Sequence, residues 1–414
     1  MDKEYMERLI YEYNPQLVGK KVELPSFKRH LYFELLKWID KKQIIAITGL
    51  RRVGKTTLMK QLMQQFDNAT FFSFDEEETQ TKKALLFVID FFINNLKSKY
   101  IFLDEVHYIK DWEGVLKRYY DTKNIKFVVS GSESLELKKG KESLAGRIVT
   151  FLLEPLNFRE YLELKGKKIE KVDYPSMLPE KEFFEFEFVE YLYKGAFPEI
   201  VNEKDEEVIR KYITELVVKK IIYGDIPRIF EIRRRDLLFA LFRYICNNSA
   251  NLFEIKNLCN IFSADYETIS NYLFYLQEAF LIKVSKIYSK SIAKRIRRNK
   301  KIYVVHPSVA LAVLGYKRDM LVEKILGQYV ESLFGGKHFW RDKHKNEVDI
   351  VIEGRPVEVK YKSDISKEDT KGILRFMNTF KSKYGIIVTK DLFKEEKVND
   401  AKISYIPAWY FSLL

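Results

Sequence analysis

The sequence predicts an α/β protein built around a parallel sheet, and two observations support this prediction. The apolar segment 44–47 leads through a glycine-containing loop into a helical pattern. A second apolar segment, 100–103, ends in Asp104 and Glu105, and a helical pattern separates it from a strand-like run at 69–74. Strands that alternate with helices form parallel sheets, whose strands are apolar throughout because both faces are buried.

The loop after the first strand has the G-x-x-x-x-G-K-[ST] spacing of a phosphate-binding loop. Its glycines allow turns that point N–H groups at a phosphate, and the helix opening at Lys55 adds its positive dipole end. We expect Lys55 to reach the β- and γ-phosphates of ATP and the Thr56 hydroxyl to bind magnesium. An ordinary strand-to-helix turn is the alternative. The predicted nucleotide contacts here are Gly49, Leu50, Arg51, Arg52, Val53, Gly54, Lys55, Thr56 and Thr57.

Asp104 and Glu105 follow a buried strand, at the carboxyl edge where parallel sheets bind ligands. We expect Asp104 to hold magnesium through water, and Glu105 to orient and deprotonate the water that attacks ATP. A strand that simply ends in acidic residues is the alternative. Because a strand and a helix lie between the two signatures, we predict the ATPase subclass in which an extra strand separates their strands in the sheet.

A further strand, 125–129, ends in Ser130-Gly131-Ser132. A polar side chain at this strand tip can touch the γ-phosphate or the attacking water. We therefore predict Ser130, or else Ser132, as a sensor of the bound nucleotide. Short polar residues also cap helices, and that alternative stays open.

Composition sets limits on domain number, partner and location. The chain has 414 residues, which predicts two or three domains, and its net charge of +13 favours a polyanionic partner. A solvated surface rich in Lys and Glu is the alternative source of that charge. Cys246 and Cys259 form neither a disulfide framework nor a CxxC metal pair. The longest apolar run, 84–93, is far shorter than the ~20 residues of a membrane helix. We expect a soluble cytoplasmic protein without membrane contact.

Further motifs follow in the chain: Gly146-Arg147, Pro155-Leu156 and Gly195-Ala196-Phe197-Pro198-Glu199. Together with the phosphate loop, Leu103-Asp104-Glu105 and Ser130-Gly131-Ser132, they resemble the archaeal-type ATPase family of the AAA+/STAND group over most of the chain. The resemblance implies that Arg147 is an arginine finger, acting in cis or from a neighbour, which leaves an oligomer open. It also implies that Gly195 and Pro198 lie near the adenine in a helical lid. The glycine usually doubled in the last motif is Gly195-Ala196 here.

The middle of the chain predicts a winged helix-turn-helix, with helices at 237–246, 253–262 and 266–280 and strands at 281–287 and 301–305. The predicted recognition helix, 265–279, carries little positive charge. The wing, 283–301, contains nine Lys or Arg and no Asp or Glu. We expect this basic wing to bind double-stranded DNA through release of phosphate counterions. A solvated hairpin or a surface that docks another domain is the alternative.

The C-terminal part pairs Asp349 on one predicted strand with Glu358 and Lys360 on the next, after a helix at 321–334. This is the arrangement of restriction-endonuclease-like sites, and period-2 alternation puts Glu358 and Lys360 on one face. We expect Asp349 and Glu358 to hold magnesium and Lys360 to orient or deprotonate water. Glu323 or Glu331 would complete the site. The alternatives are a nuclease fold kept as a binding module and two strands whose charges coincide by chance.

The predicted fold is therefore a P-loop NTPase sheet with a helical lid, a winged helix-turn-helix and a C-terminal α/β restriction-endonuclease-like domain. The predicted function is magnesium-dependent hydrolysis of ATP to ADP and phosphate, coupled to DNA binding and a nuclease-like module. One alternative is a slow nucleotide-dependent switch or adaptor with an inactive nuclease fold, and another is an ATP-gated DNA nuclease. The predicted N-terminal polar arm, ATPase core, helical lid, winged helix and nuclease-like domain span 1–22, 23–165, 166–232, 233–310 and 311–414.

Overall fold

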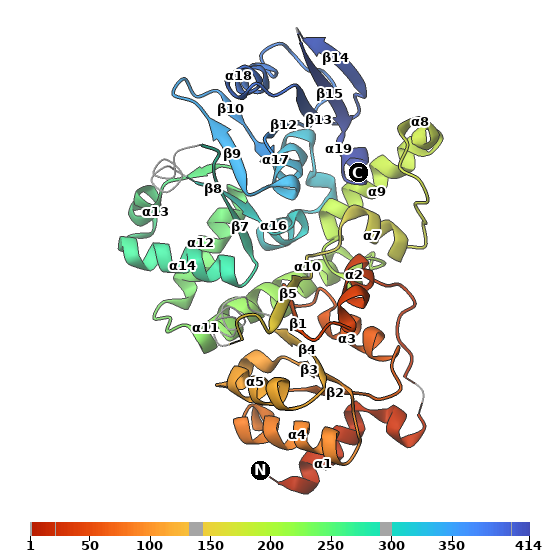
Figure 1. Ribbon diagram of the computed structural model, residues 1–414. Helices are drawn as coiled ribbons and strands as arrows, with labels where there is room; N and C mark the ends of the chain where they lie inside the picture. The colour runs from red at the N-terminus through yellow and green to blue at the C-terminus, as the bar shows by residue number, and fades with distance from the viewer. Residues whose placement is uncertain (1, 21, 132–143, 290–299, 399) are drawn as a thin grey trace. The chain divides into compact units, whose positions relative to one another are not determined.

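The computed structural model describes residues 2–20, 22–131, 144–289, 300–398 and 400–414 (Figure 1). The chain divides into two compact units, Met1–Glu154 and Pro155–Leu414. No helix within the described ranges has the length and apolar content needed to cross a membrane.

The first unit is built on a five-stranded sheet of order β2-β3-β4-β1-β5, in which every neighbouring pair is parallel. Strand β4 lies between β1, which precedes the phosphate loop, and β3, which ends in Asp104. The prediction of an extra strand between the two signature strands is confirmed. The strands are β1 Ile44–Thr48, β2 Ala69–Ser73, β3 Tyr100–Asp104, β4 Lys126–Gly131 and β5 Ile148–Leu152.

Helices cover both faces of this sheet (Figure 1). Alternate strand residues such as Ile44, Ala46, Ile101 and Leu103 pack in one core with apolar residues of α1, α4 and α5. Helices α2 and α3 pack against each other on the sheet as well. Burial on both faces explains why the central strands are apolar throughout. The helices are α1 Lys3–Tyr13, α2 His30–Ile39, α3 Lys55–Met63, α4 Lys82–Asn94 and α5 Trp112–Thr122.

The predicted polar arm at the N-terminus is wrong for α1. This helix buries Met6, Leu9 and Ile10 in the core of the first unit, while its other faces are polar. The side chain of Asn14, at its end, donates to the backbone oxygen of Phe71 at 2.7 Å and accepts from the backbone nitrogen of Phe71 at 2.8 Å. A narrow apolar stripe on an otherwise charged helix is enough to pack it.

The second unit begins with helices and continues into two five-stranded sheets. Its first helices are α7 Phe158–Leu164, α8 Tyr174–Met177, α9 Lys181–Lys194 and α10 Glu206–Lys211, followed by π-helical segments Tyr212–Lys219 and Ile221–Asp225 and by α11 Ile226–Ile229. The next elements are α12 Arg235–Asn247, β6 Leu252–Phe253, α13 Ile255–Phe262, α14 Tyr266–Glu278, β7 Ile282–Ile287 and β8 Lys300–Val304. Three helices and two antiparallel strands thus follow one another in the predicted order.

The first sheet of this unit, of order β10-β9-β7-β8-β6, crosses the predicted domain boundary at 310/311. Strand β7 pairs in parallel with β9, through Lys286 with His338 and Ile287 with Phe339. The intervening and following elements of this region are α16 Pro307–Leu314, α17 Glu323–Phe334, β9 His338–Arg341 and β10 Glu347–Val348. The predicted winged-helix and C-terminal parts therefore share one sheet.

The second sheet has the order β11-β12-β13-β15-β14 and carries the predicted Glu-x-Lys strand. Strands β11 and β12 form the expected antiparallel hairpin, and β12, β13 and β15 are parallel neighbours. Its elements are β11 Ile350–Ile352, β12 Arg355–Lys360, α18 Lys371–Phe380, β13 Tyr384–Thr389, β14 Lys394–Val398, β15 Ala401–Pro407 and α19 Ala408–Phe411.

Candidate functional site

The phosphate loop joins the end of β1 to the first turn of α3, and two of its residues must be glycine. Gly54 has a φ of 97°, a left-handed value that glycine adopts without strain. At Gly49, an added Cβ atom would lie 2.2 Å from the carbonyl oxygen of Leu153. The backbone of the loop therefore depends on both glycines of the motif.

Lys55 is buried beneath this loop. Its ammonium donates to the carbonyl oxygens of Gly49 and Leu50, at 3.0 and 3.2 Å. These bonds place the positive charge beside the loop residues whose N–H groups are predicted to surround phosphate. Of the other predicted contacts, the side chain of Val53 is buried, Arg52 and Thr56 are exposed, and Arg51 and Thr57 are partly buried.

Arg29, which the motifs did not reveal, supports the loop from outside. It is buried at the N-terminal end of α2, and its guanidinium donates to the carbonyl oxygens of Val53 and Glu154, each at 2.8 Å. Arginine can fix two such acceptors at once because its donors form a rigid planar fork. The two ends of this contact lie 24 and 125 residues from Arg29 in the chain, so no local spacing indicates it.

A chain of hydrogen bonds connects the two predicted signatures at the carboxyl edge of the sheet. Thr56 Oγ1 donates to Asp104 Oδ2 at 2.7 Å, and Ser130 Oγ donates to Asp104 Oδ1. The same Ser130 oxygen accepts from the backbone nitrogen of Glu105 at 3.1 Å. A hydroxyl and a carboxylate that meet beside the loop are the donor set that magnesium prefers. The residues present therefore fit a magnesium ion bound with nucleotide.

The two adjacent carboxylates have different surroundings. Burial raises the pKa of Asp104 to about 6, and the nearby charge of Glu105 adds to this, while bonds from Ser130 and Thr56 oppose it. Glu105 has a φ of 55°, and its Oε2 lies 3.1 Å from Nδ1 of the buried His107. Ser130 belongs to strand β4, so the helix-cap alternative does not apply to it. Ser132, the other sensor candidate, lies outside the described residues.

Arg147 lies at the opposite edge of the sheet from the phosphate loop. Its carbonyl oxygen accepts from the backbone nitrogen of Ile44, where β1 begins, and its guanidinium pairs with Asp121 at 2.9 Å. The five residues of β1 separate this edge from the loop by roughly 16 Å. Of the two alternatives for Arg147, this position does not favour action in cis. A role at the site of a neighbouring molecule stays a prediction.

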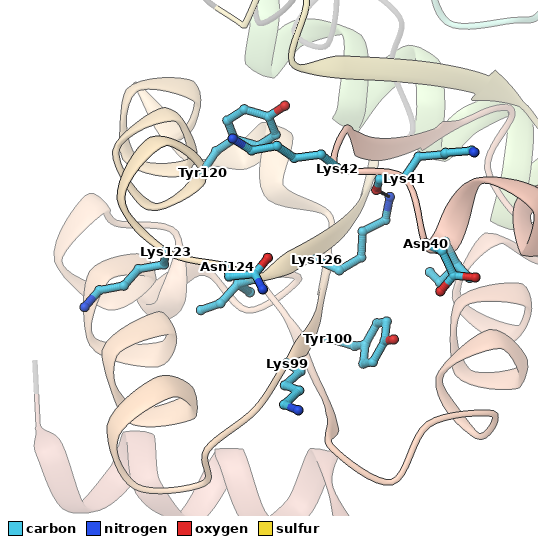
Figure 2. Close-up of a pocket in the computed structure, with 11 residues that line it drawn as sticks. Asp40, Lys41, Lys42, Lys99, Tyr100, Tyr120, Lys123, Asn124 and Lys126 are labelled. Carbon is cyan, nitrogen blue, oxygen red and sulfur yellow. Dashed lines mark hydrogen bonds between the residues drawn. The ribbon is translucent and has the colours of Figure 1, made fainter.

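A pocket of about 340 Å³ lies at this same amino edge, lined by lysines that include Lys41, Lys42, Lys99 and Lys126 (Figure 2). The Lys126 ammonium has a structural role, because it donates to the carbonyl oxygens of Trp38, Lys41 and Gln43. The pocket is therefore separate from the predicted nucleotide site, which lies at the phosphate loop on the carboxyl edge.

Gly195 and Pro198 belong to the second unit, and their predicted contact with adenine stays a prediction. Gly195 ends α9, where an added Cβ would lie 2.6 Å from the backbone oxygen of Tyr191. The next residue, Ala196, accepts a 3.1 Å bond from the backbone nitrogen of Leu156. Two motifs of the family resemblance are thus hydrogen-bonded to each other, which gives Gly195 a structural role.

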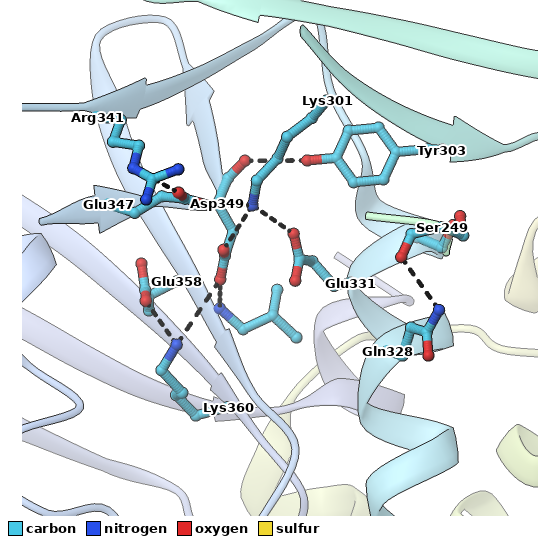
Figure 3. Close-up of polar contacts among 12 residues, drawn as sticks. Ser249, Lys301, Tyr303, Gln328, Glu331, Arg341, Glu347, Asp349, Glu358 and Lys360 are labelled. Carbon is cyan, nitrogen blue, oxygen red and sulfur yellow. Dashed lines mark hydrogen bonds and ion pairs between the residues drawn. The ribbon is translucent and has the colours of Figure 1, made fainter. Parts of the chain in front are cut away.

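The predicted C-terminal residues lie together in the second unit (Figure 3). Asp349 Oδ2 accepts from the backbone nitrogen of Val359 at 2.9 Å and lies 4.0 Å from Lys360 Nζ. Lys360 also pairs with Glu358 at 2.6 Å. Of the two candidates on the preceding helix, Glu331 joins this cluster, whereas Glu323 pairs with Lys390 at 2.9 Å.

Lys301 is the residue that sequence reasoning misplaced. It belongs to the predicted basic wing, yet only 3% of its side chain is exposed and its ammonium pairs with Glu331, Glu347 and Asp349. The expectation that Lys301 binds DNA is therefore wrong, because β8 directs it into the carboxylate cluster. The wing residues 290–299 lie outside the described residues. Among the described residues, no group of three or more His, Cys, Asp or Glu is arranged to hold a metal ion.

Charges in this cluster alter one another's protonation. Although burial opposes ionisation, Lys301 and Lys360 hold the pKa of Asp349 below its ordinary value. Burial and the charge of Asp349 raise the pKa of Glu331 and of Glu358 to about 8. Lys301 and Lys360 keep their charge despite burial, because the surrounding carboxylates raise the pKa of both ammonium groups. Of Asp349, Glu331 and Glu358, Asp349 is thus the carboxylate whose ionised form the two lysines stabilise most.

Comparison with known proteins agrees with the geometry of the first site. Residues 41–162 match a family model described as an AAA domain, while 185–319 and 320–411 match two domains of unknown function, DUF8612 and DUF4143. An uncharacterized protein, MJ1637 of Methanocaldococcus jannaschii, is 28% identical over 91% of this chain and 85% of its own. An uncharacterized protein of Haemophilus influenzae is 23% identical over 91% and 96%, respectively.

Among solved structures, the Walker-type ATPase paby2304 of Pyrococcus abyssi has a TM-score of 0.47 at 16% identity, covering 71% of this chain and 99% of its own. The AAA family match contains the phosphate loop, Asp104, Glu105 and Ser130. The AAA family match over residues 41–162 therefore supports a P-loop ATPase domain in this part of the chain.

Proposed function

We propose that the protein is a magnesium-dependent ATPase that hydrolyses ATP to ADP and phosphate. The observation that carries this proposal is the hydrogen-bonded chain from Thr56 through Asp104 to Ser130 beside the phosphate loop. Lys55 supplies fixed positive charge to the phosphates, and the loop N–H groups orient them. Bound magnesium would neutralise charge that develops on the phosphates, held by Thr56 and Asp104. Glu105 accepts the proton of the attacking water, and Ser130 positions Glu105 through its backbone nitrogen.

A slow nucleotide switch is the competing form of this proposal. Steady-state ATP turnover, compared with ATP affinity in the same buffer, separates the two. An ATPase turns over repeatedly with magnesium and stops in EDTA. Tight binding with negligible turnover, both without and with duplex DNA, would favour the switch instead.

We further propose that the second unit binds double-stranded DNA through a winged helix-turn-helix. Helices α12, α13 and α14 followed by the antiparallel strands β7 and β8 support this reading, because that is the element order of the motif. Lys286 on β7 is exposed, and five Lys or Arg occur between 290 and 299. Coupling would appear as a change in ATP turnover when duplex DNA is added.

For the C-terminal part, we propose a nuclease-like fold that serves as a binding module and does not cut DNA. The observation that favours this over an ATP-gated nuclease is the ammonium group of Lys301 among the carboxylates of the predicted metal site. A hydrolytic site of this kind needs a divalent ion to activate water and to stabilise the leaving group.

A further inference from the structure

Three carboxylates of the second unit surround one ammonium group (Figure 3). Lys301 Nζ lies 2.8 Å from Glu331 Oε1, 2.5 Å from Glu347 Oε1 and 3.0 Å from Asp349 Oδ1. A lysine ammonium has three N–H donors and no acceptor. Lys301 donates hydrogen bonds to Glu331 and Asp349, and it forms an ion pair with Glu347.

We infer that Lys301 is a built-in cation, which takes the place of the divalent metal ion implied by the resemblance to restriction-endonuclease-like sites. The carboxylates that would bind such an ion instead neutralise a charge that belongs to the chain itself. As long as the ammonium group of Lys301 occupies the carboxylate cluster, this site holds no divalent ion.

The remaining oxygens of the cluster also favour this assignment. Asp349 Oδ2 is held by the backbone nitrogen of Val359 at 2.9 Å, and Glu358 Oε1 is held by Lys360 at 2.6 Å. Glu358 Oε2 has no hydrogen-bond partner among the described residues. Magnesium requires near-octahedral oxygen coordination at about 2.0–2.1 Å, and calcium takes about six to eight oxygens. The carboxylates of this cluster already hold two ammonium groups, Lys301 and Lys360, and a divalent ion next to these two charges would not obtain such a shell.

The sheet fixes the position of Lys301 beside the carboxylates. Strand β8 pairs with β7 through Lys301 and Ser285, so the backbone of Lys301 is fixed within a sheet. The aromatic ring of Tyr303, also on β8, is buried, and its hydroxyl donates to the carbonyl oxygen of Asp349 at 3.2 Å. Two side chains of one strand therefore hold Asp349 from the same side.

This inference rests on the proposed non-cutting role of the C-terminal part, and it predicts that removal of Lys301 opens a metal site. We would titrate Mn²⁺ into the full chain without nucleotide and count bound ions by electron paramagnetic resonance. Wild type and Asp349→Asn should give the same isotherm. Lys301→Met should bind one additional Mn²⁺ per chain, and the double variant Lys301→Met/Asp349→Asn should lose it.

Two results would overturn the inference. One is Mn²⁺ binding by wild type that Asp349→Asn removes, and the other is a folded Lys301→Met that gains no ion. Lys301→Gln replaces Lys301→Met if the latter fails to fold, and Mn²⁺ should then raise its melting temperature more than K⁺ of equal ionic strength. If neither neutral variant folds, the comparison of wild type with Asp349→Asn decides. ATP turnover, measured in parallel, tests the ATPase proposal separately.

Discussion

The hydroxyl of Thr56 and the carboxylate of Asp104 are joined by a 2.7 Å hydrogen bond across the carboxyl edge of the sheet. The two residues lie 48 positions apart in the chain and come from the phosphate-loop helix and from β3. Their contact places the two predicted magnesium ligands side by side, and it can be tested by removing the hydroxyl alone.

We expect Thr56→Val to weaken ATP binding in magnesium by roughly ten- to a hundredfold, because the variant lacks the hydroxyl proposed to hold the ion. We take the lost interaction to be similar in size to a hydrogen bond to a charged group, which contributes about 1.5–3 kcal/mol. Thr56→Ser keeps the hydroxyl and should bind nearly as wild type. Equilibrium binding of a fluorescent ATP analogue would measure both variants with magnesium and with EDTA. An equal loss for Thr56→Val in EDTA would show that the hydroxyl does not act through magnesium.

Lys55 and Glu105 should separate nucleotide binding from hydrolysis. Lys55→Ala removes the charge that we propose lies beside the phosphates, and it should lose ATP binding. Glu105→Gln keeps the shape but not the proton acceptor, so it should bind ATP and turn over about 10²–10⁴-fold more slowly. Binding titrations and single-turnover hydrolysis would measure the two steps, and equal loss of binding in both variants would refute these roles.

Neutralising Arg295, Arg297 and Arg298 should weaken binding to duplex DNA. Each phosphate contact adds about 0.9 to the slope of log affinity against log salt concentration, so the slope should fall by up to about three. Fluorescence anisotropy at several salt concentrations would measure it.

The control for that experiment removes three exposed lysines elsewhere in the second unit. This triple variant has the same net charge, and its DNA affinity should change little. An unchanged slope in the arginine variant, or an equal change in the control, would assign the basic segment to solvent or to contacts between domains. The control lysines are Lys367, Lys394 and Lys397.

The C-terminal site should not cut DNA. We expect plasmid and linear duplex to stay intact in magnesium or manganese, with and without ATP, because Lys301 occupies the carboxylate cluster. Asp349→Ala and Lys360→Ala should behave as wild type on an agarose gel. Cleavage by wild type that either variant abolishes would establish a nuclease.

The stability of the second unit should fall in mild acid because of His306. Burial lowers the pKa of this side chain to about 3, and Nδ1 accepts from the backbone nitrogen of Ser308 at the start of α16. The unfolded chain binds a proton below about pH 6.5, whereas the folded chain does not. His306 therefore contributes stability above that pH, and this contribution is lost as the pH falls towards 3, by about 1.4 kcal/mol per pH unit.

His306→Asn is the matched variant, because asparagine also caps helices but does not titrate. Between pH 6.5 and 5, wild type should lose about 2 kcal/mol more than the variant. Hydrogen exchange of amides in β8 and α16 would report this difference within the second unit. Parallel pH profiles for the two proteins would mean that His306 does not control acid stability.

The sequence predicted those parts of the candidate site that depend on local spacing. Lys55 and Thr56 follow from the motif, and Asp104 follows from the end of an apolar strand. Asp349 could be paired with Glu358 because a hairpin fixes which residues face each other. The predicted helix pattern in the middle of the chain was also close to the observed elements, because apolar periodicity indicates helices that pack on one face.

The parts that sequence analysis missed depend on distant segments. Arg147 directly precedes β5, which is parallel to β1, so Arg147 lies at the amino edge of the sheet. The order of motifs along the chain does not tell whether two strands run in the same direction. Lys301 appeared to be one more charge in a basic run. Its burial depends on carboxylates that lie 30 to 48 residues further along the chain. Arg29 was missed for the same reason.

The pairing of β7 with β9 affects how this protein can be divided. Family models match 185–319 and 320–411 separately, yet a fragment starting at 320 would contain Asp349 and Glu331 without Lys301. It would also expose β9 as an unpaired edge, which promotes strand exchange between molecules. Recombination at that boundary in evolution would separate β7 from β9, and it would also separate Lys301 from the carboxylates that it neutralises. The two regions are therefore expected to be inherited together, and a relative that carries only one of them would need a different partner strand.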